Sequence, residues 1–120
     1  DEGAIAVAAS IQSDDLWVDS SRGECVDMVA PGFELSAAGY EGQGTVAGTS
    51  FAAPVVTGAV ALLLEQLPDA LPRDIHAELI KRATDVAAGK LVYVGCWDDA
   101  AAVAVSCDDE DDPPPQSPPE

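Results

Sequence analysis

The most constraining feature of this sequence is a long run of small apolar residues that begins at a hydroxyl-bearing pair. Residues 46–64 are VAGTSFAAPVVTGAVALLL. Alanine, valine and leucine at this density predict a helix over about residues 49–67, ended by Pro68. Because such a helix has no polar face, it must be buried. We therefore expect the chain to hold Ser50 at the mouth of a core helix.

Short apolar segments alternate with a second helical pattern along the rest of the chain. We expect strands over residues 4–10, 25–32 and 90–95, an amphipathic helix over 71–86, and a glycine-rich loop or weak hairpin over 39–48. Strands that alternate with helices favour an α/β layer structure with a parallel sheet. Three strands and two helices are few for this class, because parallel sheets are covered on both faces. We infer that part of the sheet lies outside this chain.

Charge and composition exclude several classes of partner. The 22 acidic residues outweigh 5 basic ones, for a net charge of −17, so the chain would repel nucleic acid. Residues 58–64 are apolar for only about two turns, and no membrane-spanning segment is predicted. Residues 107–120, CDDEDDPPPQSPPE, are too acidic and proline-rich to fold. We predict a disordered tail, or a linker to a further module, over residues 96–120.

The position of Ser50 suits a nucleophile. Gly48 permits a tight backbone before it, and Pro54 is expected in the first helical turn. Small residues along the helix let neighbouring elements approach closely: Ala52, Ala53, Gly58, Ala59 and Ala61. Free N–H groups and the dipole at a helix N-terminus favour the negative charge that nucleophilic attack creates. The alternative is that Thr49 or Ser50 caps the helix, which is the commoner role for these residue types.

The residues around Ser50 resemble a known signature. GTSFAAPVVTG is similar to the G-T-S-x-A-x-P-x-V-x-G pattern of the subtilisin-like serine proteases, the subtilases or peptidase S8 family. GECVDMVAPG and AIAVAAS resemble the strands before the active serine of that family, and LPDALPRDIHAELIKRATDV and GKLVYV resemble its closing helix and last strand. The resemblance covers about residues 4–95. It implies that residues 1–95 are the C-terminal part of a doubly wound catalytic domain, and that the protein is secreted.

The resemblance also implies roles for individual residues. Ser50 would be the nucleophile that forms the acyl-enzyme, and its own backbone N–H would be one oxyanion donor. The matching motif positions are Gly48, Thr49, Ala52, Pro54 and Gly58. Phe51 and Val55 replace the Met and His that are usual in the family, and neither change removes a catalytic atom. The implied substrate is a protein or peptide. Catalysis needs no cofactor, while structural calcium is implied for the parent protein without assignable ligands.

The remaining catalytic groups are missing from this chain. The subtilisin triad follows the chain order Asp, His, Ser, yet no histidine precedes Ser50. Helix geometry places the single histidine, His76, about 18 Å from Ser50, beyond the hydrogen-bond reach of about 3 Å. The chain contains no asparagine, the family's second oxyanion donor. We predict that the chain is inactive alone and that its partner is the N-terminal part of the same domain. The alternative is a non-catalytic paralogue or binding module.

Cysteines and acidic residues give weaker signals. Cys96 and Cys107 are near enough in sequence to form a disulfide, and the family resemblance ties Cys25 to a segment further upstream. Four aspartates are candidates for a triad or metal role, but their pattern favours solvated surface or turn residues: Asp14, Asp15, Asp19 and Asp27. Neither zinc spacing nor an EF-hand pattern occurs, so no metal site is predicted in this chain.

Overall fold

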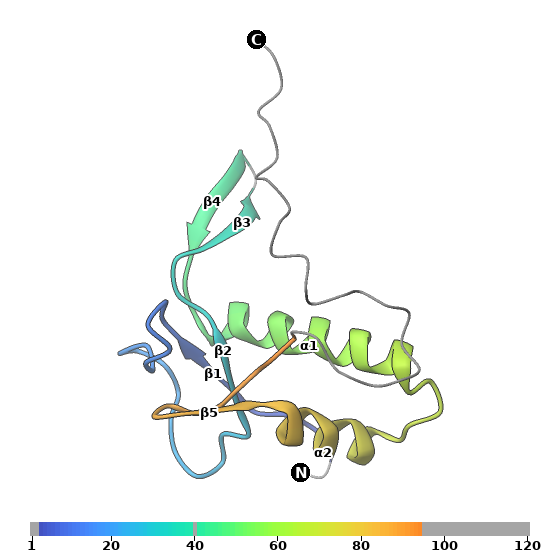
Figure 1. Ribbon diagram of the computed structural model, residues 1–120. Coiled ribbons are helices and arrows are strands. Elements are labelled where there is room, and N and C mark those ends of the chain that lie inside the picture. Colours follow the sequence, from blue (N-terminus) through green and yellow to red (C-terminus); the bar gives the residue numbers. More distant parts are fainter. Residues whose placement is uncertain (1–2, 40, 95–120) are drawn as a thin grey trace, which may run out of the picture.

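The computed structural model describes residues 3–39 and 41–94. A four-stranded sheet packs against two helices, and a separate hairpin stands away from them (Figure 1). In chain order the elements are β1 Val7–Ser10, β2 Met28–Pro31, β3 Leu35–Gly39, β4 Gly42–Val46, α1 Thr49–Gln66, α2 Pro72–Arg82, β5 Thr84–Val86 and β6 Gly89–Leu91. The predicted α/β class is therefore confirmed, while residues 95–120, including the predicted tail, lie outside the described residues.

The sheet has the order β1-β2-β6-β5. Strands β1, β2 and β6 are parallel, with Val7 opposite Met28 and Val29 opposite Leu91. The edge strand β5 is antiparallel to β6, because the two form a tight hairpin that turns at Gly89 with φ of 130°. The sequence did not predict β5: the amphipathic pattern extended the second helix to residue 86, whereas α2 ends at Arg82.

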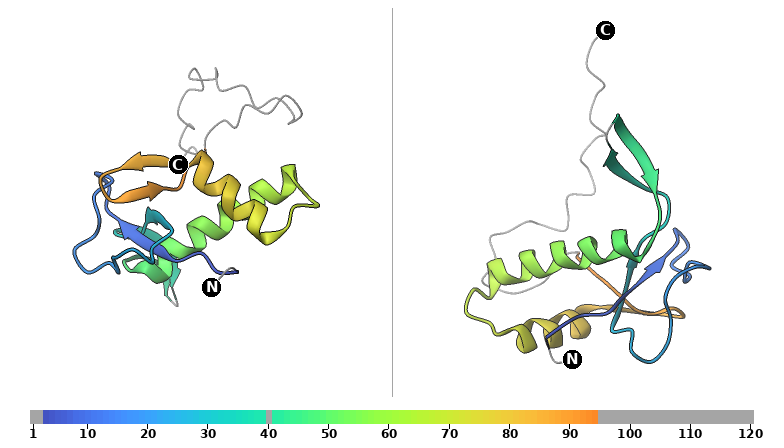
Figure 2. Two further views of the ribbon diagram at one scale, coloured as in Figure 1. Left: turned by 90° about the horizontal axis from the view of Figure 1, so that it is seen from below. Right: turned by 180° about the vertical axis from the view of Figure 1, so that it is seen from behind.

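One buried cluster joins both helices to the sheet. Helix α1 buries residues at helical spacing, namely Ala52, Val56, Ala59 and Leu63. They pack with Ala9, Met28 and Ala30 of the sheet and with Ile75 and Leu79 of α2. Figure 2 shows α1 and α2 side by side, to the same side of the strands in both views. Small sheet residues are what allow a helix backbone to come this close.

The opposite surface of α1 is open in this structure. Leu62 and Leu64 are 49% and 39% exposed, so the expectation of a fully buried helix is met on one face only. By length and composition α1 could also cross a membrane. This is a property of length and composition only, and the expectation of no membrane partner stays a prediction. A core helix of a globular domain passes the same test, and α1 packs its buried face on the sheet.

The hairpin of β3 and β4 leads directly into α1. Its register pairs Leu35 with Val46 and Gly39 with Gly42. The prediction of a loop or weak hairpin is confirmed as a hairpin, although it begins at Leu35 and not at residue 39. Most of its residues are exposed and small. The hairpin contributes little to the core, and its position bears on what can approach the start of α1.

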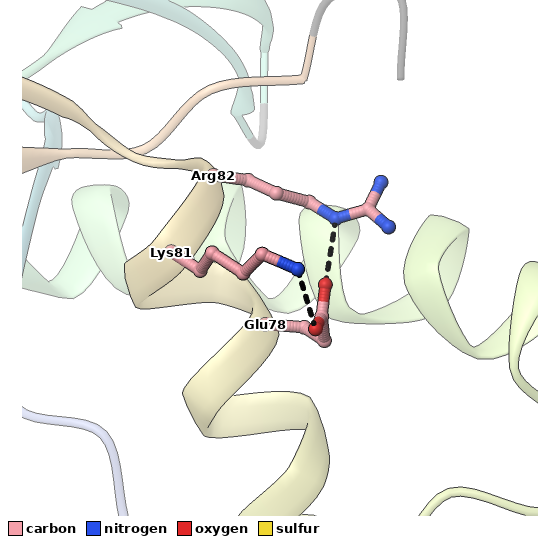
Figure 3. Close-up of polar contacts among 3 residues, drawn as sticks. All are labelled: Glu78, Lys81 and Arg82. Carbon is pink, nitrogen blue, oxygen red and sulfur yellow. Dashed lines mark hydrogen bonds and ion pairs between the residues drawn. The ribbon is translucent and has the colours of Figure 1, made fainter. Parts of the chain in front are cut away.

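Helix α2 satisfies its own ends. Pro72 occupies the first turn, and the Asp74 carboxylate accepts a hydrogen bond from the Leu71 N–H at 3.1 Å. In the last turns, Glu78 Oε2 accepts from Arg82 Nε at 3.1 Å, and Glu78 Oε1 lies 3.4 Å from Lys81 Nζ (Figure 3). The hydrogen bond from Arg82 is the main reason that the pKa of Glu78 is lowered, and Lys81 adds to the effect.

Candidate active site

The first turn of α1 has no side-chain cap. The helix begins at Thr49, and its N-cap is Gly48, with φ of 143° and ψ of 158°. No side chain makes a capping hydrogen bond there. The interpretation that Thr49 or Ser50 caps the helix is therefore wrong. Because a φ of 143° strains any residue with a Cβ, glycine is required at position 48.

The Gly48 carbonyl oxygen accepts the first two hydrogen bonds of the helix, as the carbonyl of an N-cap residue does. It accepts hydrogen bonds from Phe51 N–H at 3.0 Å and from Ala52 N–H at 3.3 Å. Ser50 is the second helical residue, so no carbonyl one turn earlier within the helix can accept its N–H. The side chain of Ser50 is exposed, and the first turn carries no acidic residue. An exposed hydroxyl beside N–H groups at the positive end of the dipole suits a developing oxyanion.

Pro54 lies one turn further into the helix than the sequence analysis placed it. It is the sixth residue of α1, inside the helix and not in its first turn. Proline has no N–H to donate to the carbonyl four residues earlier, and its ring crowds that carbonyl. That carbonyl belongs to Ser50. Pro54 therefore leaves the Ser50 C=O without its ladder donor.

Ser50 lies at the carboxyl edge of the parallel strands. The Gly48 N–H donates to the Gly32 carbonyl at 2.7 Å, and the Gly32 N–H donates to the Ser10 carbonyl at 3.0 Å. Ser10 ends β1, and Gly32 follows the last residue of β2. In open α/β sheets, ligands bind outside the carboxyl ends of the strands. The edge on which the start of α1 rests is thus the one where a substrate cleft is expected.

His76 lies near the amino end of β2, at the opposite ends of the strands from Ser50. Its Nε2 is 3.8 Å from Asp27 Oδ1, and Asp27 Oδ2 accepts from the Ala6 N–H at 2.8 Å. Asp27 precedes Gly32 by five residues of mostly extended chain, or about 16 Å. The histidine and aspartate resemble two members of a triad but are remote from the serine. A pocket of about 1080 Å³ opens beside them, lined in part by Cys25 and Arg73.

The other predicted residues have different surroundings. Ala52 is fully buried beneath the first turn, whereas a Cβ at Gly58 would meet no atom within 4 Å in the part of the chain that is described. Cys25 is exposed and carries a free thiol, and the proposed partners Cys96 and Cys107 fall outside the described residues. Within residues 3–39 and 41–94, no three His, Cys, Asp or Glu side chains gather to hold a metal ion.

Two residues that hold the backbone around the site, Ser20 and Gly32, were not predicted from the sequence. Ser20 is 6% exposed, and its hydroxyl oxygen accepts the Ala9 N–H at 2.8 Å, which fastens the loop after β1 to the edge of that strand. A serine in a polar loop gives no pattern that marks it as buried. The second is Gly32, whose place after Pro31 was interpreted only as the end of a strand. Proline–glycine marks a turn, but it does not show how tightly the turn is packed.

Comparison with known proteins identifies relatives of the whole described region. The model of the subtilase family matches residues 2–96. The chain is 39% identical over 84 residues to an extracellular serine proteinase of Thermus sp. (strain Rt41A), covering 68% of this chain and 20% of the relative. It is 35% identical over 81 residues to alkaline serine exoprotease A of Vibrio alginolyticus, covering 67% and 15%. The chain thus spans a fifth or less of the length of these curated relatives.

A solved structure gives the same result in three dimensions. The fold matches a cold adapted subtilisin-like serine proteinase with a TM-score of 0.73 and 33% sequence identity. The match covers 77% of this chain and 37% of that one. The architecture of the sheet, the two helices and the hairpin is therefore that of one part of a larger subtilisin-like domain.

Proposed function

The chain belongs to the subtilase family, and we propose that it carries the nucleophile of a serine endopeptidase. Ser50 Oγ attacks the scissile carbonyl and loses its proton to a base, while the Ser50 N–H donates to the oxygen that becomes negative. The base passes its proton to the leaving nitrogen, so that collapse of this intermediate breaks the C–N bond, releases the amine and leaves an acyl group on Ser50. Water then attacks the acyl carbon, which releases the carboxylic acid and returns a proton to Ser50 Oγ. The observation that carries the proposal is the exposed Ser50 at the uncapped, positive end of α1.

The general base, its orienting carboxylate and the second oxyanion donor come, in this proposal, from residues outside the 120-residue chain. The only histidine lies beside Asp27 at the far edge of the sheet, and the chain has no asparagine. Without a base, a serine hydroxyl is a weak nucleophile near neutral pH. We therefore propose that these residues alone are inactive, and that their functional partner is the N-terminal part of the same catalytic domain.

The exposed apolar surface of α1 supports the same partner. Leu62 and Leu64 are large apolar side chains that flank the buried stripe of α1 on its two sides and remain partly exposed. A parallel sheet is ordinarily covered on both faces, and its central helices are shielded from water. We propose that further elements of the catalytic domain cover this surface.

Substrate and location follow from the same proposal. The substrate is a protein or peptide that lies extended beside the hairpin and the start of α1, and the protein is secreted, as the name of the Thermus relative states for that protein. No cofactor takes part in the chemistry, and the net charge of −17 opposes nucleic acid. Structural calcium is proposed for the complete protein, with no ligands assigned in this chain.

A fluorophosphonate probe tests the proposal, because it reacts with activated serines. The probe is expected to label the product of the complete gene at Ser50, located by mass spectrometry, and to leave the isolated 120-residue chain unlabelled. Ser50→Ala abolishes the label, while Ser13→Ala, on an exposed loop, leaves it unchanged. Rapid labelling of the isolated chain would refute its inactivity. An unlabelled complete product would replace the protease with a non-catalytic binding module.

A further inference from the structure

We propose that Gly32 is a positioning residue for Ser50, an inference that rests on the proposed role of Ser50 as nucleophile. Gly32 joins the sheet to the first turn of α1 through backbone atoms only. The Gly32 N–H donates to the Ser10 carbonyl at 3.0 Å, and the Gly32 carbonyl accepts from the Gly48 N–H at 2.7 Å. The Gly48 carbonyl then receives the N–H groups of Phe51 and Ala52. This relay of hydrogen bonds sets the position of the Ser50 backbone relative to the sheet.

The space around Gly32 explains why no other residue fits. A Cβ at this position would lie 2.5 Å from Ala9 Cβ, 3.0 Å from the Gly48 carbonyl oxygen and 3.1 Å from Ala52 Cβ. Each of these is a backbone atom or a Cβ, which cannot swing aside as the end of a long side chain can. The requirement concerns space and not backbone conformation, because Gly32 is not among the glycines with positive φ.

The crowded oxygen is the one that organises the first turn. The Gly48 carbonyl oxygen accepts from the N–H groups of Phe51 and Ala52, the two residues that directly follow Ser50. A methyl group on residue 32 would push this oxygen and Ala52 away from the sheet, and the backbone of Ser50 would move with them. Misplacement of a reacting group by about 1 Å can cost about 100-fold in rate. Gly32 would thus act on catalysis without touching the substrate.

Gly32→Ala in the complete gene product tests the proposal kinetically. A positioning role predicts that kcat for a peptide substrate falls about 100-fold while KM changes less than about threefold. Ile75→Val is the control, because it trims a buried methyl of α2 away from the relay. Its kcat should stay within about twofold of the parent. A kcat for Gly32→Ala as high as that of Ile75→Val would overturn the proposal.

A second measurement does not depend on activity. Amide hydrogen exchange of Gly48, followed by NMR in the same two variants, reports the hydrogen bond to Gly32 directly. Gly32→Ala is expected to accelerate this exchange at least about tenfold relative to Ile75→Val. If the unaltered complete protein hydrolyses no peptide, the proposed function fails, and this measurement still decides whether Gly32 fixes the start of α1. An unchanged rate of amide hydrogen exchange at Gly48 in Gly32→Ala would by itself overturn the positioning role.

A double variant separates positioning from simple packing. Ala9→Gly combined with Gly32→Ala removes the 2.5 Å contact but keeps the approach to the Gly48 oxygen. A positioning role predicts a fold restored toward the parent, with Gly48 exchange and kcat still altered. Complete recovery of both would overturn the proposal, because the damage would then come from the Ala9 contact alone. If the double variant fails to fold while Ile75→Val folds, the proposal is overturned too, because glycine at position 32 would then be needed for the sheet to fold and not for placing Ser50.

Discussion

The two helices of this protein are stabilised in opposite ways. Helix α2 has a carboxylate at its start, two bases in its last turn and one buried stripe, all specified within its own sequence. Helix α1 has a glycine N-cap, neither an acid in its first turn nor a base in its last, and a proline in its interior. By local criteria α2 is the better helix, although it is the shorter one.

The difference indicates what each helix is for. A helix that only packs can satisfy its ends with side chains, as α2 does. The start of α1 is instead held by the backbone of Gly32, which leaves the Thr49 and Ser50 N–H groups without a side-chain cap and the Ser50 side chain exposed. A capping side chain there would occupy the place that an oxyanion needs. Local stability is thus reduced at the position where the proposed chemistry occurs.

The largest expected effect tests whether tertiary packing stabilises α1. Leu63 of α1 is fully buried in the cluster that joins α1 to the sheet and to α2. Leu63→Ala should therefore lower the free energy of unfolding by about 2–5 kcal/mol. Leu62→Ala, on the open face, is the matched control and should cost less than about 1 kcal/mol. Urea unfolding followed by circular dichroism measures both. Equal losses would show that the open face is also packed.

The next effect concerns the interior proline. Pro54→Ala supplies the donor that the Ser50 carbonyl lacks and removes the crowding of the ring. It should raise the free energy of unfolding by about 1–2 kcal/mol, less than the full helix penalty of proline because the unfolded chain also gains freedom. Thermal unfolding measures this change. Pro72→Ala is the control, because a proline in the first turn of α2 blocks no hydrogen bond within the helix, and its replacement should not raise the free energy of unfolding. A destabilised Pro54→Ala would break the contrast between the helices.

The caps should differ by a smaller amount. Asp74→Ala removes the carboxylate that accepts the Leu71 N–H, and it should cost about 0.5–1 kcal/mol. Thr49→Ala should change stability by less than about 0.5 kcal/mol, because no side chain caps α1. Denaturant midpoints of the two variants decide the comparison. A larger loss for Thr49→Ala would restore the capping role that the structure contradicts.

The smallest effect depends on pH. Because the pKa of Glu78 is lowered in the folded chain, mainly by Arg82, the unfolded chain binds the proton more readily. The stabilisation is therefore complete above the ordinary carboxyl pKa of about 4.3 and is lost as pH falls through the lowered value. Glu78→Gln should cost less than about 0.5 kcal/mol at pH 7, since the group is partly solvated. Unfolding curves of both proteins should converge in acid, and a difference that grows in acid would contradict this.

Much of the fold could be predicted from local pattern. The strands around Ala8 and Val29 are short apolar runs, and the buried stripe of α2 at Ile75 and Leu79 follows the helical period. The family was recognisable because GTSFAAPVVTG is long and its flanks agree. Such signals survive in a single sequence because they depend on neighbours within a few residues.

The two failures have different causes. The residues of β5 resemble the end of a helix by pattern, but they pair with β6 once the turn before Gly89 brings the two strands together. That pairing depends on contacts that a short window of sequence does not contain. The place of Pro54 needed no such contact, because a helix that starts at residue 49 already makes Pro54 its sixth residue.

The sequence by itself determined most of the elements, the family and the serine, because periodicity, charge and a specific motif are properties of consecutive residues. Only the tertiary structure decided how that serine is held. It placed Gly32 within reach of Ala9, Gly48 and Ala52, and it set His76 beside Asp27 at the other edge of the sheet. The physical reason is that packing distances and backbone hydrogen bonds between distant segments exist only after the chain has folded.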